Sequence, residues 1–293
     1  MFSNAGNYRR DPLCPLIVPL VNPSHFDIIP AQQKALSLQK GFIVTNANCS
    51  TTGIAIPFHA LEKAFGPLET VMVTTMQAIS GAGYPGVSSL DILDNVVPLI
   101  GGEEEKIEWE LSKILGGLSD NKDAFALRHD SAHPLAVSAA CNRVPVVDGH
   151  LECASIRFSV RPPPSPEAIK EALRAFTCEV QDLGCPSAPE QAVYVHDEPD
   201  RPQPRLDRYF QNGSGVNVGR IRPCPVLDVK FVCLSNNVSI GAATSSIINV
   251  SVLSVRVLES TELTWSVLRR PSTRSPKTSF RPSLLLSYID LLS

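Results

Sequence analysis

The sequence has no long uninterrupted apolar stretch, no secretory signal and no large net charge, as is typical of an ordinary globular protein. Prolines break its longest apolar stretches, such as residues 13–23, well short of the roughly 18 to 20 residues of a membrane-spanning helix. The N-terminal segment MFSNAGNYRRDPL has neither the apolar core nor the cleavage site of a secretory signal, so we expect a cytoplasmic protein with no membrane partner. With 26 basic and 29 acidic residues the net charge is -3, which argues against a nucleic acid partner.

Cysteine usage excludes the common metal and redox motifs. Eight cysteines occur among 293 residues, but none forms a CxxC pair or a Cys/His cluster at zinc-finger spacing, so we expect no metal site. Hydrophobic residues make up 43% and charged residues 19% of the chain, as in a globular protein of one large or two smaller domains.

The order of apolar and polar residues predicts alternating strands and helices, and therefore an α/β fold. Residues 12–30 favour short strands and turns, and residues 49–66 a helix capped by Ser50, Thr51 or Thr52, which Pro57 should kink. The other predicted strands are 41–48, 68–80, two within 134–160 and two or three within 192–237, and the other helices are 103–117, 165–176 and, more weakly, 241–258.

The strongest chemical signal is TNANCSTTG at residues 45–53, which brings a cysteine to the start of a helix. Unpaired backbone amides and the helix dipole there favour a thiolate, so Cys49 is a candidate nucleophile. Asn48 could donate a hydrogen bond to a developing oxyanion, together with the amide of Cys49. The alternative is a buried cysteine with only a packing role.

A nucleophilic cysteine needs a base, and His150 in NRVPVVDGHLE is the best placed candidate. Asp148 and Gly149 permit a tight turn that aims the imidazole inward. Arg143, seven residues earlier, could bind a carboxylate in bidentate fashion. A surface histidine and an ordinary arginine ion pair are the alternatives.

Five windows occur in the order and at the spacing of one family: TNANCSTTG, TTMQAISGAGYPG, LDNVVPLIGGEEEKIEWELSKILGG, NRVPVVDGHLE and RPQPRLDR. From about residue 4 to about residue 250 the chain resembles the aspartate-semialdehyde dehydrogenases of the fungal and archaeal branch. Glyceraldehyde-phosphate dehydrogenases and N-acetyl-glutamyl-phosphate reductases share the strand–cysteine–helix arrangement but not the GGEEEKIEWE or RVPVVDGH windows.

The resemblance implies NADP-dependent, reversible conversion of aspartyl 4-phosphate to aspartate semialdehyde and phosphate, on the route to threonine, methionine and lysine. Cys49 would form the thioester and His150 would be the acid/base. The other implied roles are substrate orientation by Gln77, α-carboxylate binding by Arg143, amino-group binding by Glu103, phosphate binding by Lys106 and Arg9, and lining of the nicotinamide site by Ser80, Gly81 and Asn237. A homodimer or homotetramer is expected.

The chain departs from the family at both ends. Family members begin with a Rossmann unit that carries a glycine-rich loop, and about 100 residues of this unit are expected to be absent before Met1. The single G-x-G-x-x-G, at residues 81–86, contains Pro85 and follows a mid-chain strand, so we do not interpret it as the pyrophosphate loop. The basic, proline-containing segment 269–283 predicts a disordered C-terminal tail.

The expected fold is therefore an incomplete Rossmann NADP-binding domain plus an α/β dehydrogenase dimerisation and catalytic domain. The boundaries are 1–48 for the NADP-binding remnant, 49–235 for the catalytic and dimerisation domain, 236–255 for the return segment and 256–293 for the tail. Two alternatives stay open: a non-catalytic remnant that keeps the dimerisation domain, and an acyl reductase of the malonyl-CoA type.

Overall fold

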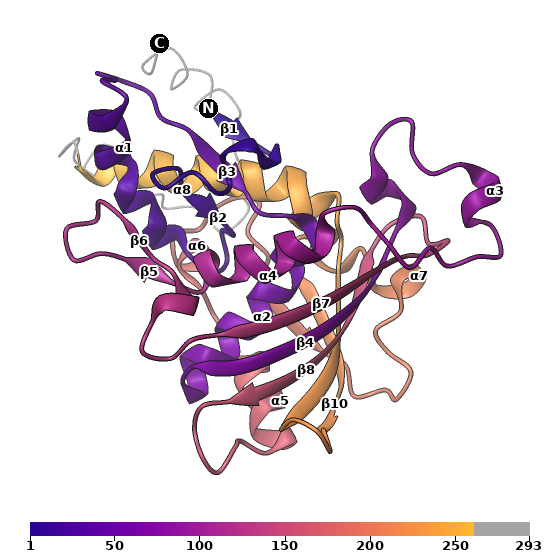
Figure 1. Cartoon of the computed structure of the whole chain (residues 1–293). Coiled ribbons are helices and arrows are strands. Elements are labelled where there is room, and N and C mark those ends of the chain that lie inside the picture. The colour runs from indigo at the N-terminus through magenta and orange to yellow at the C-terminus, as the bar shows by residue number, and fades with distance from the viewer. Residues whose placement is uncertain (261–293) are drawn as a thin grey trace, which may run out of the picture. The chain divides into compact units, whose positions relative to one another are not determined.

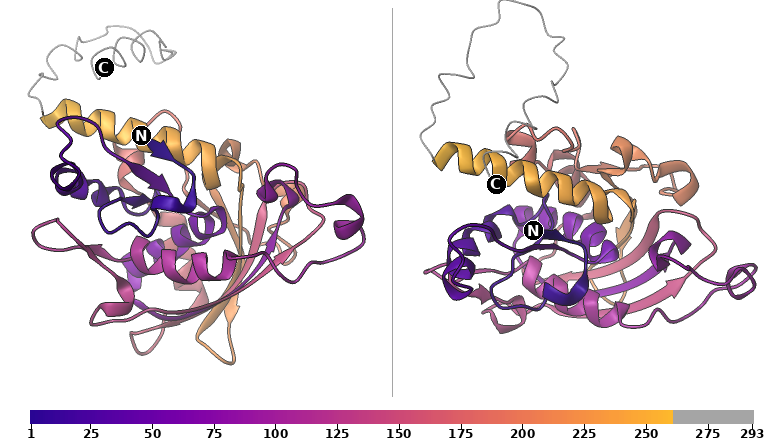
Figure 2. Two further views of the ribbon diagram at one scale, coloured as in Figure 1. Left: turned by 45° about the horizontal axis from the view of Figure 1, so that its top comes forward. Right: turned by 90° about the horizontal axis from the view of Figure 1, so that it is seen from above.

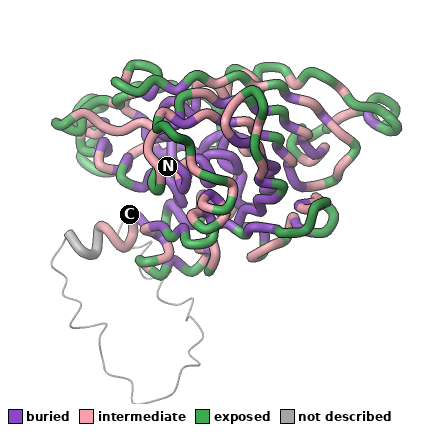
Figure 3. Tube along the Cα trace, turned by 90° about the horizontal axis from the view of Figure 1, so that it is seen from below, coloured by how far each residue is buried: buried purple, intermediate pink, exposed green. Residues whose placement is uncertain are grey.

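The computed structural model describes residues 1–260, with side chains up to Arg256, and it contains both helices and strands (Figure 1). Residues Met1–Arg256 pack into one unit. The tail expected over 256–293 lies almost entirely outside the described residues. Figure 3 shows the buried residues grouped inside this unit, with exposed residues in the loops around them.

A six-stranded mixed sheet forms the larger layer, in the order β7-β4-β8-β11-β10-β9. β8 and β11 are antiparallel to their neighbours in the centre, whereas β7 and β9 run parallel to theirs at the two edges. The strands are β4 (Leu68–Gln77), β7 (Ala136–Arg143), β8 (His150–Phe158), β9 (Val193–Val195), β10 (Val216–Pro223) and β11 (Val229–Ser235).

Three helices cover one face of this sheet: α2 (Cys49–Phe65), α4 (Glu103–Ile114) and α5 (Pro166–Ala175) (Figures 1 and 2). β4 alternates accordingly, because Val71 and Val73 are buried toward the helices whereas Met72 is 50% exposed on the other face. The expected helices and strands of this region are confirmed to within a few residues. α2 continues through Pro57 as one helix, and Phe58 packs edge-on against Phe231 of β11.

A smaller parallel sheet is formed by β1 (Phe2–Ser3), β3 (Val44–Asn46) and β2 (Leu16–Ile17), in that order. The prediction of short strands over residues 12–30 is correct only for β2. Pro23 and Pro30 occupy first-turn positions instead, and a 3₁₀ helix over Pro23–Ile28 leads into α1 (Ile29–Ala35). Proline favours such positions because it lacks the N–H that is unpaired there in any case.

α8 (Thr244–Ser260) runs beside this small sheet (Figure 2). The amide of Asn46 in β3 donates to the carbonyl of Ala242 and to the hydroxyl of Ser246, and it accepts a hydrogen bond from Asn249. Ile248 and Val252 are buried, so packing outweighs the weak helix propensity of this Ser-, Val- and Ile-rich segment.

The remaining elements are short connections. They are α3 (Ser89–Ile92), β5 (Gly117–Leu118), β6 (Phe125–Ala126), α6 (Glu179–Asp182) and α7 (Pro204–Asp207). Among the described residues, no helix combines the length and the apolar character needed to cross a membrane.

Candidate active site

Cys49 and His150, 101 residues apart in sequence, meet where α2 and β8 begin. Cys49 is the first residue of α2 and His150 the first residue of β8. The Cys49 sulfur lies 3.2 Å from Nε2 of His150, whose side chain is fully buried. The predicted nucleophile and its partner are therefore brought together.

A backbone contact defines the protonation state of the imidazole. The N–H of Ala78, just after β4, donates to Nδ1 of His150 at 3.0 Å. Because Nδ1 accepts this hydrogen bond, we assign the ring proton of the neutral histidine to Nε2, facing the sulfur. Burial, and secondarily the charge of Arg143, lowers the pKa of His150 to about 3.

The thiol is protonated in this state, contrary to the sequence expectation. Burial, and then the negative charge of Glu103, raises the pKa of Cys49 to about 12. The amides of Ser50 and Cys49 lower it, as expected at a helix start, but burial outweighs them. The nucleophile and its partner are thus a neutral pair before substrate binds.

The turn before His150 is held from two directions. Arg208, from the RPQPRLDR window, donates from Nη1 to the carbonyl of Asp148 at 3.3 Å. The N–H of Gly149 donates to Oδ1 of Asn237 at 2.9 Å, and Nδ2 of Asn237 donates to the hydroxyl of Ser80 at 2.9 Å. Asn237 therefore connects the predicted nicotinamide side of the site to the residue before His150.

Glu103 connects several of the predicted substrate residues. One of its carboxylate oxygens accepts from Nζ of Lys106 at 2.6 Å. The other accepts from Nδ2 of Asn48 at 2.8 Å and, more weakly, from Nε2 of Gln77 at 3.4 Å. Glu103 is 7% exposed, so these contacts are largely shielded from water.

Asn48, not the three residues predicted to cap α2, is its N-cap. Oδ1 of Asn48 accepts from the backbone N–H of Ser50 and Thr51, while Nδ2 is bonded to Glu103. Ser50 and Thr51 lie inside the first turn, because the Asn48 backbone is extended and its carbonyl already accepts from the amide of Thr52. Nδ2 of Asn48 carries a second N–H, so an oxyanion could bind this amide while the bond to Glu103 is kept.

The two predicted arginines are both held by other groups. Arg143 is 6% exposed, and its Nη1 donates to the carbonyl of Ala78 at 2.7 Å. Arg143 pairs with Gln77 across the β4–β7 ladder. Arg9 makes an ion pair with Glu110 of α4, with Nη1 and Oε1 2.9 Å apart.

A cavity of about 470 Å³ brings most of these groups to one space. Its lining comprises Asn4, Gly6, Arg9, Ala47, Asn48, Cys49, Ser80, Gly81, Gly83, Glu103, Lys106, Asn237, Val238, Gly241 and Ala242. Two glycines keep it open near the sulfur. A Cβ at Gly241 would lie 2.9 Å from that of Cys49, and one at Gly81 would lie 3.0 Å from both Arg143 and His150.

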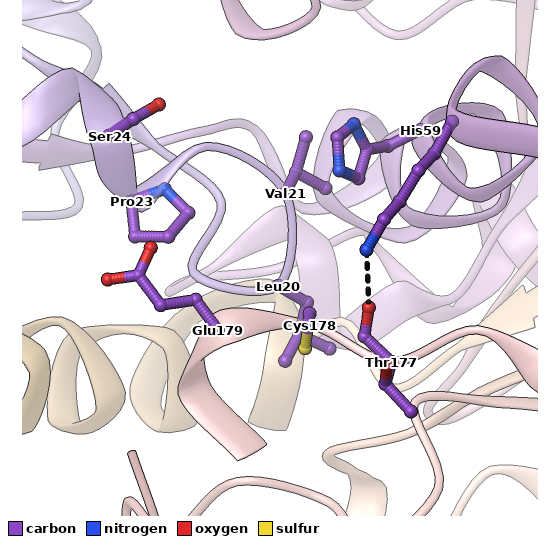
Figure 4. A pocket seen from close by; sticks show the side chains of 9 residues that line it. Leu20, Val21, Pro23, Ser24, His59, Thr177, Cys178 and Glu179 are labelled. Carbon is purple, nitrogen blue, oxygen red and sulfur yellow. Dashed lines mark hydrogen bonds between the residues drawn. The ribbon is translucent and has the colours of Figure 1, made fainter. Parts of the chain in front are cut away.

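A second cavity, of about 190 Å³, lies at the other end of α2 (Figure 4). It is lined by Leu20, Val21, Pro23, Ser24, His59, Lys63, Thr177, Cys178 and Glu179, and includes no predicted site residue. Nζ of Lys63 donates to the carbonyl of Thr177 at 3.2 Å across it.

Sequence reasoning missed two groups that hold site residues in place. Glu110 lies seven residues after Glu103, so helical periodicity could have placed both on one face of the helix. The N–H of Ala78 left no sequence signal, because any residue except proline supplies one. Within residues 1–260 we find no cluster of three His, Cys, Asp or Glu side chains that could hold a metal ion.

The G-x-G-x-x-G motif has a backbone unlike that of a dinucleotide loop. Gly81 lies in a 3₁₀ turn (Ile79–Ala82), and the next helix is only the four-residue α3. A pyrophosphate loop instead passes directly from a strand into a long helix. Within residues 1–260, no strand leads through a glycine-rich loop directly into a helix.

Comparisons with known proteins identify the family. Residues 58–240 match the model of the semialdehyde dehydrogenase dimerisation domain. The chain is 66% identical over 252 residues to the aspartate-semialdehyde dehydrogenase of Cryptococcus neoformans, covering 86% of this chain and 68% of that protein. It is 50% identical over 261 residues to the Saccharomyces cerevisiae enzyme, covering 87% and 71%.

Solved structures agree with these relatives. The crystal structure of aspartate-semialdehyde dehydrogenase with NADP from Candida albicans matches with a TM-score of 0.80 and 48% identity, over 88% of this chain and 71% of that one. That of Vibrio cholerae aspartate-semialdehyde dehydrogenase II complexed with ASA matches with a TM-score of 0.65 and 25% identity, over 87% and 72%. With its strand–cysteine–helix junction, its cysteine–histidine pair and these relatives, the chain belongs to the aspartate-semialdehyde dehydrogenase family.

Proposed function

We propose that the cavity around Cys49 carries out the NADP-dependent, reversible interconversion of L-aspartyl 4-phosphate and L-aspartate 4-semialdehyde plus phosphate. The observation that carries this proposal is the 3.2 Å contact between the Cys49 sulfur and Nε2 of His150, beside the ion pair of Glu103 and Lys106. The reaction belongs to threonine, methionine and lysine biosynthesis.

In the reductive direction the Cys49 sulfur attacks the acyl carbon of aspartyl phosphate. A carbon–sulfur bond forms as the carbon–oxygen bond to phosphate breaks, and the thiol proton leaves with the phosphate. NADPH, if bound beside Cys49, would supply the hydride that reduces the resulting thioester. The oxyanion of the thiohemiacetal then re-forms a carbonyl as the carbon–sulfur bond breaks, which releases the aldehyde, and the sulfur takes up one proton from solvent.

His150 assists through Nε2. Its N–H can donate a hydrogen bond to the developing oxyanion and to the departing sulfur. Transfer of that proton requires a second proton at Nδ1, which would displace the contact with the N–H of Ala78. A negative charge on the bound substrate would favour this imidazolium form, so we infer that acid–base catalysis begins only when substrate is in place.

The charged residues suit a phosphorylated amino acid. We assign the α-carboxylate to Arg143, the ammonium group to Glu103, and the phosphate to Lys106 and Arg9, with Gln77 orienting the substrate. Lys106 and Arg9 each have a carboxylate partner on α4 before substrate binds. Substrate would therefore exchange one set of ion pairs for another, which limits the desolvation cost of binding.

The cofactor side is supported at its nicotinamide end. The hydroxyl of Ser80, the amide of Asn237 and the glycine backbone at 81 line the cavity near Cys49 and could hold a flat carboxamide-bearing ring. The Candida albicans relative was solved with NADP. We accordingly propose NADP as the cofactor of this chain.

We further propose a homodimer in the cytoplasm. The match to a dimerisation domain supports self-association, and a homotetramer is the alternative outcome of a mass measurement. The alternative is a non-catalytic chain that keeps the dimerisation domain, and the activity measurement below distinguishes it from the enzyme.

The test is NADPH formation by the purified chain from aspartate semialdehyde, phosphate and NADP. We expect activity that falls by roughly 10⁴-fold or more in Cys49→Ala, as when other covalent nucleophiles are removed. A folded dimer without activity would favour the non-catalytic reading. Activity unchanged in Cys49→Ala would contradict the proposed chemistry.

A further inference from the structure

Glu110 is a buried carboxylate outside the cavity that bonds to two parts of the proposed site. It lies on α4, seven residues after Glu103, and is 1% exposed. Oε1 of Glu110 accepts from Nη1 of Arg9 at 2.9 Å. Oε2 accepts from the backbone N–H of Asn48 at 2.7 Å.

The two partners of Glu110 have different places in the site. Arg9 lines the cavity and is assigned to the phosphate, whereas Asn48 is the N-cap of α2 and directly precedes Cys49. Charge-assisted hydrogen bonds of this kind are short, directional and strong when shielded from water. One side chain thus fixes the distance between Arg9, the cation assigned to the phosphate, and α2, the helix that begins with Cys49.

Arg9 is otherwise held in a way that leaves part of its guanidinium free. Its Nη2 donates to the carbonyl of Asn4 at 2.9 Å, and its own carbonyl accepts from Nζ of Lys113 at 3.0 Å. Nε of Arg9 is buried without a hydrogen-bond partner among the described residues. A buried, unpaired N–H is costly.

We propose that Glu110 is a positioning residue for the reaction: it orients the guanidinium of Arg9 toward the phosphate and fixes the peptide of Asn48 at the start of α2. The inference rests on the proposed function, because it needs the phosphate to bind at Arg9. Glu110 does not line the cavity and touches no reacting atom. Its effect passes through Arg9, so it belongs to phosphate binding more than to the chemical step.

The decisive variant is Glu110→Gln, which keeps an acceptor for the Asn48 amide but removes the ion pair with Arg9. We expect the Kd of inorganic phosphate and the KM for phosphate to rise roughly tenfold, as when supporting partners of other charged ligands are removed. The KM for aspartate semialdehyde and kcat should stay within about twofold. Phosphate binding is measured by calorimetric titration of the full chain, and the kinetic constants by NADPH formation.

Glu108→Gln is the matched control. Glu108 lies on the same helix, and its carboxylate accepts from the backbone N–H of Ala139 at 3.0 Å. Glu108 contacts neither Arg9 nor Asn48 in the described hydrogen bonds. The Glu108→Gln variant should therefore bind phosphate with the affinity of the wild type. The double variant Arg9→Ala/Glu110→Gln should bind phosphate as Arg9→Ala does, because one residue acts through the other.

Several outcomes would overturn the inference. Phosphate affinity that is unchanged or tighter in Glu110→Gln would show that the carboxylate does not orient Arg9. So would losses that add in the double variant, or an equal loss in every kinetic constant. A wild-type chain that does not bind phosphate would remove the phosphate subsite and this inference together. Phosphate binding with the expected pattern but no NADPH formation would instead preserve the inference and contradict the proposed reaction.

Discussion

The two ends of the Cys49 cavity differ in the charge of their side chains. At one end, Cys49 and His150 are a neutral pair, and the backbone N–H of Ala78 holds the imidazole. At the other end, the side chains of α4 form ion pairs with Lys106 and Arg9. Before substrate binds, the pair of Cys49 and His150 is neutral, whereas the second end already contains the charges that the substrate must meet.

This difference indicates that the two ends have separate roles, with substrate binding at the charged end and the chemical step at the neutral end. Neither Cys49 nor His150 is ionised by its surroundings alone, because desolvation disfavours the charged form of both. Paired cations and carboxylates can exchange partners with a zwitterionic ligand without leaving a buried charge unpaired. Substrate binding at the charged end therefore creates the conditions for chemistry at the neutral end.

The largest expected effect that tests this division comes from Glu103→Gln, since Glu103 touches both ends. Removing its charge should lower kcat/KM for aspartate semialdehyde by roughly 100-fold, because the ammonium group and Lys106 both lose a buried partner. It should also lower the pKa of Cys49, whose thiol Glu103 disfavours ionising. Alkylation of Cys49 by iodoacetamide at pH 8 should then be about fivefold faster.

Glu104→Gln is the control for both measurements, since Oε1 of Glu104 accepts from the N–H of Cys141 at 2.9 Å and makes no contact with Lys106 or Asn48 in the described hydrogen bonds. If Cys49 were alkylated no faster in Glu103→Gln than in Glu104→Gln, the charge of Glu103 would not affect the ionisation of Cys49. The two ends of the cavity would then be electrostatically independent.

A smaller effect is expected at the neutral end from Gly81→Ala. The added methyl group would meet Nη1 of Arg143 and the ring of His150 at about 3.0 Å. Both groups are buried and cannot move far, so kcat should fall by roughly tenfold while the KM for phosphate is little changed. Gly101→Ala is the control, because a Cβ there meets nothing within 4 Å. An equal rise in both KM values would contradict a local effect on the histidine.

The last effect concerns acid stability rather than catalysis, and it separates the site from the rest of the fold. The pKa of His150 is lowered to about 3 and that of His25 to about 4, both chiefly by burial. In the unfolded chain these histidines take up protons near pH 6.5, whereas in the folded chain they stay neutral until about pH 3 to 4. The free energy of unfolding is therefore highest above pH 6.5 and falls as the pH drops toward 4. Each histidine should contribute about 2 kcal/mol of loss by pH 5.

Urea unfolding at pH 7 and pH 5 measures this loss. In His25→Gln the difference in unfolding free energy between the two pH values should shrink by about 2 kcal/mol, with activity retained at pH 7. His25 lies away from the cavity, where Nδ1 contacts Asn22 and Nε2 contacts Gly116. A pH difference that persists in full would mean that other groups dominate acid unfolding.

Much of the larger sheet and its helices could be predicted from the sequence, because local patterns specify them. The acidic start of α4, the Ser165–Pro166 start of α5 and the alternation of β4 each carry their own signal. Residues 12–30 were predicted less well, since their prolines suit turns and helix starts equally. The domain boundaries and the roles of individual site residues stay predictions.

The sequence could indicate which residues form the site but not how they are arranged. Its geometry depends on contacts between distant segments, such as that of Asn48 with Glu103, which no local pattern contains. The protonation of Cys49 shows the same limit, because the helix start was visible in the sequence but the depth of burial was not.

The spacing of charges on α4 has a consequence for substrate length. Glu103, Lys106, Glu110 and Lys113 recur at helical spacing, and Glu103 is about 10 Å along the helix axis from Glu110. A helix does not stretch, so under the assigned roles Glu103, which meets the ammonium, and Glu110, which holds Arg9, keep a fixed spacing along α4. An acyl phosphate one methylene longer could not place its ammonium at Glu103 and its phosphate at Arg9 as aspartyl 4-phosphate does, so turnover of glutamyl 5-phosphate compared with aspartyl 4-phosphate in the reductive direction would measure how strictly this spacing selects substrate length.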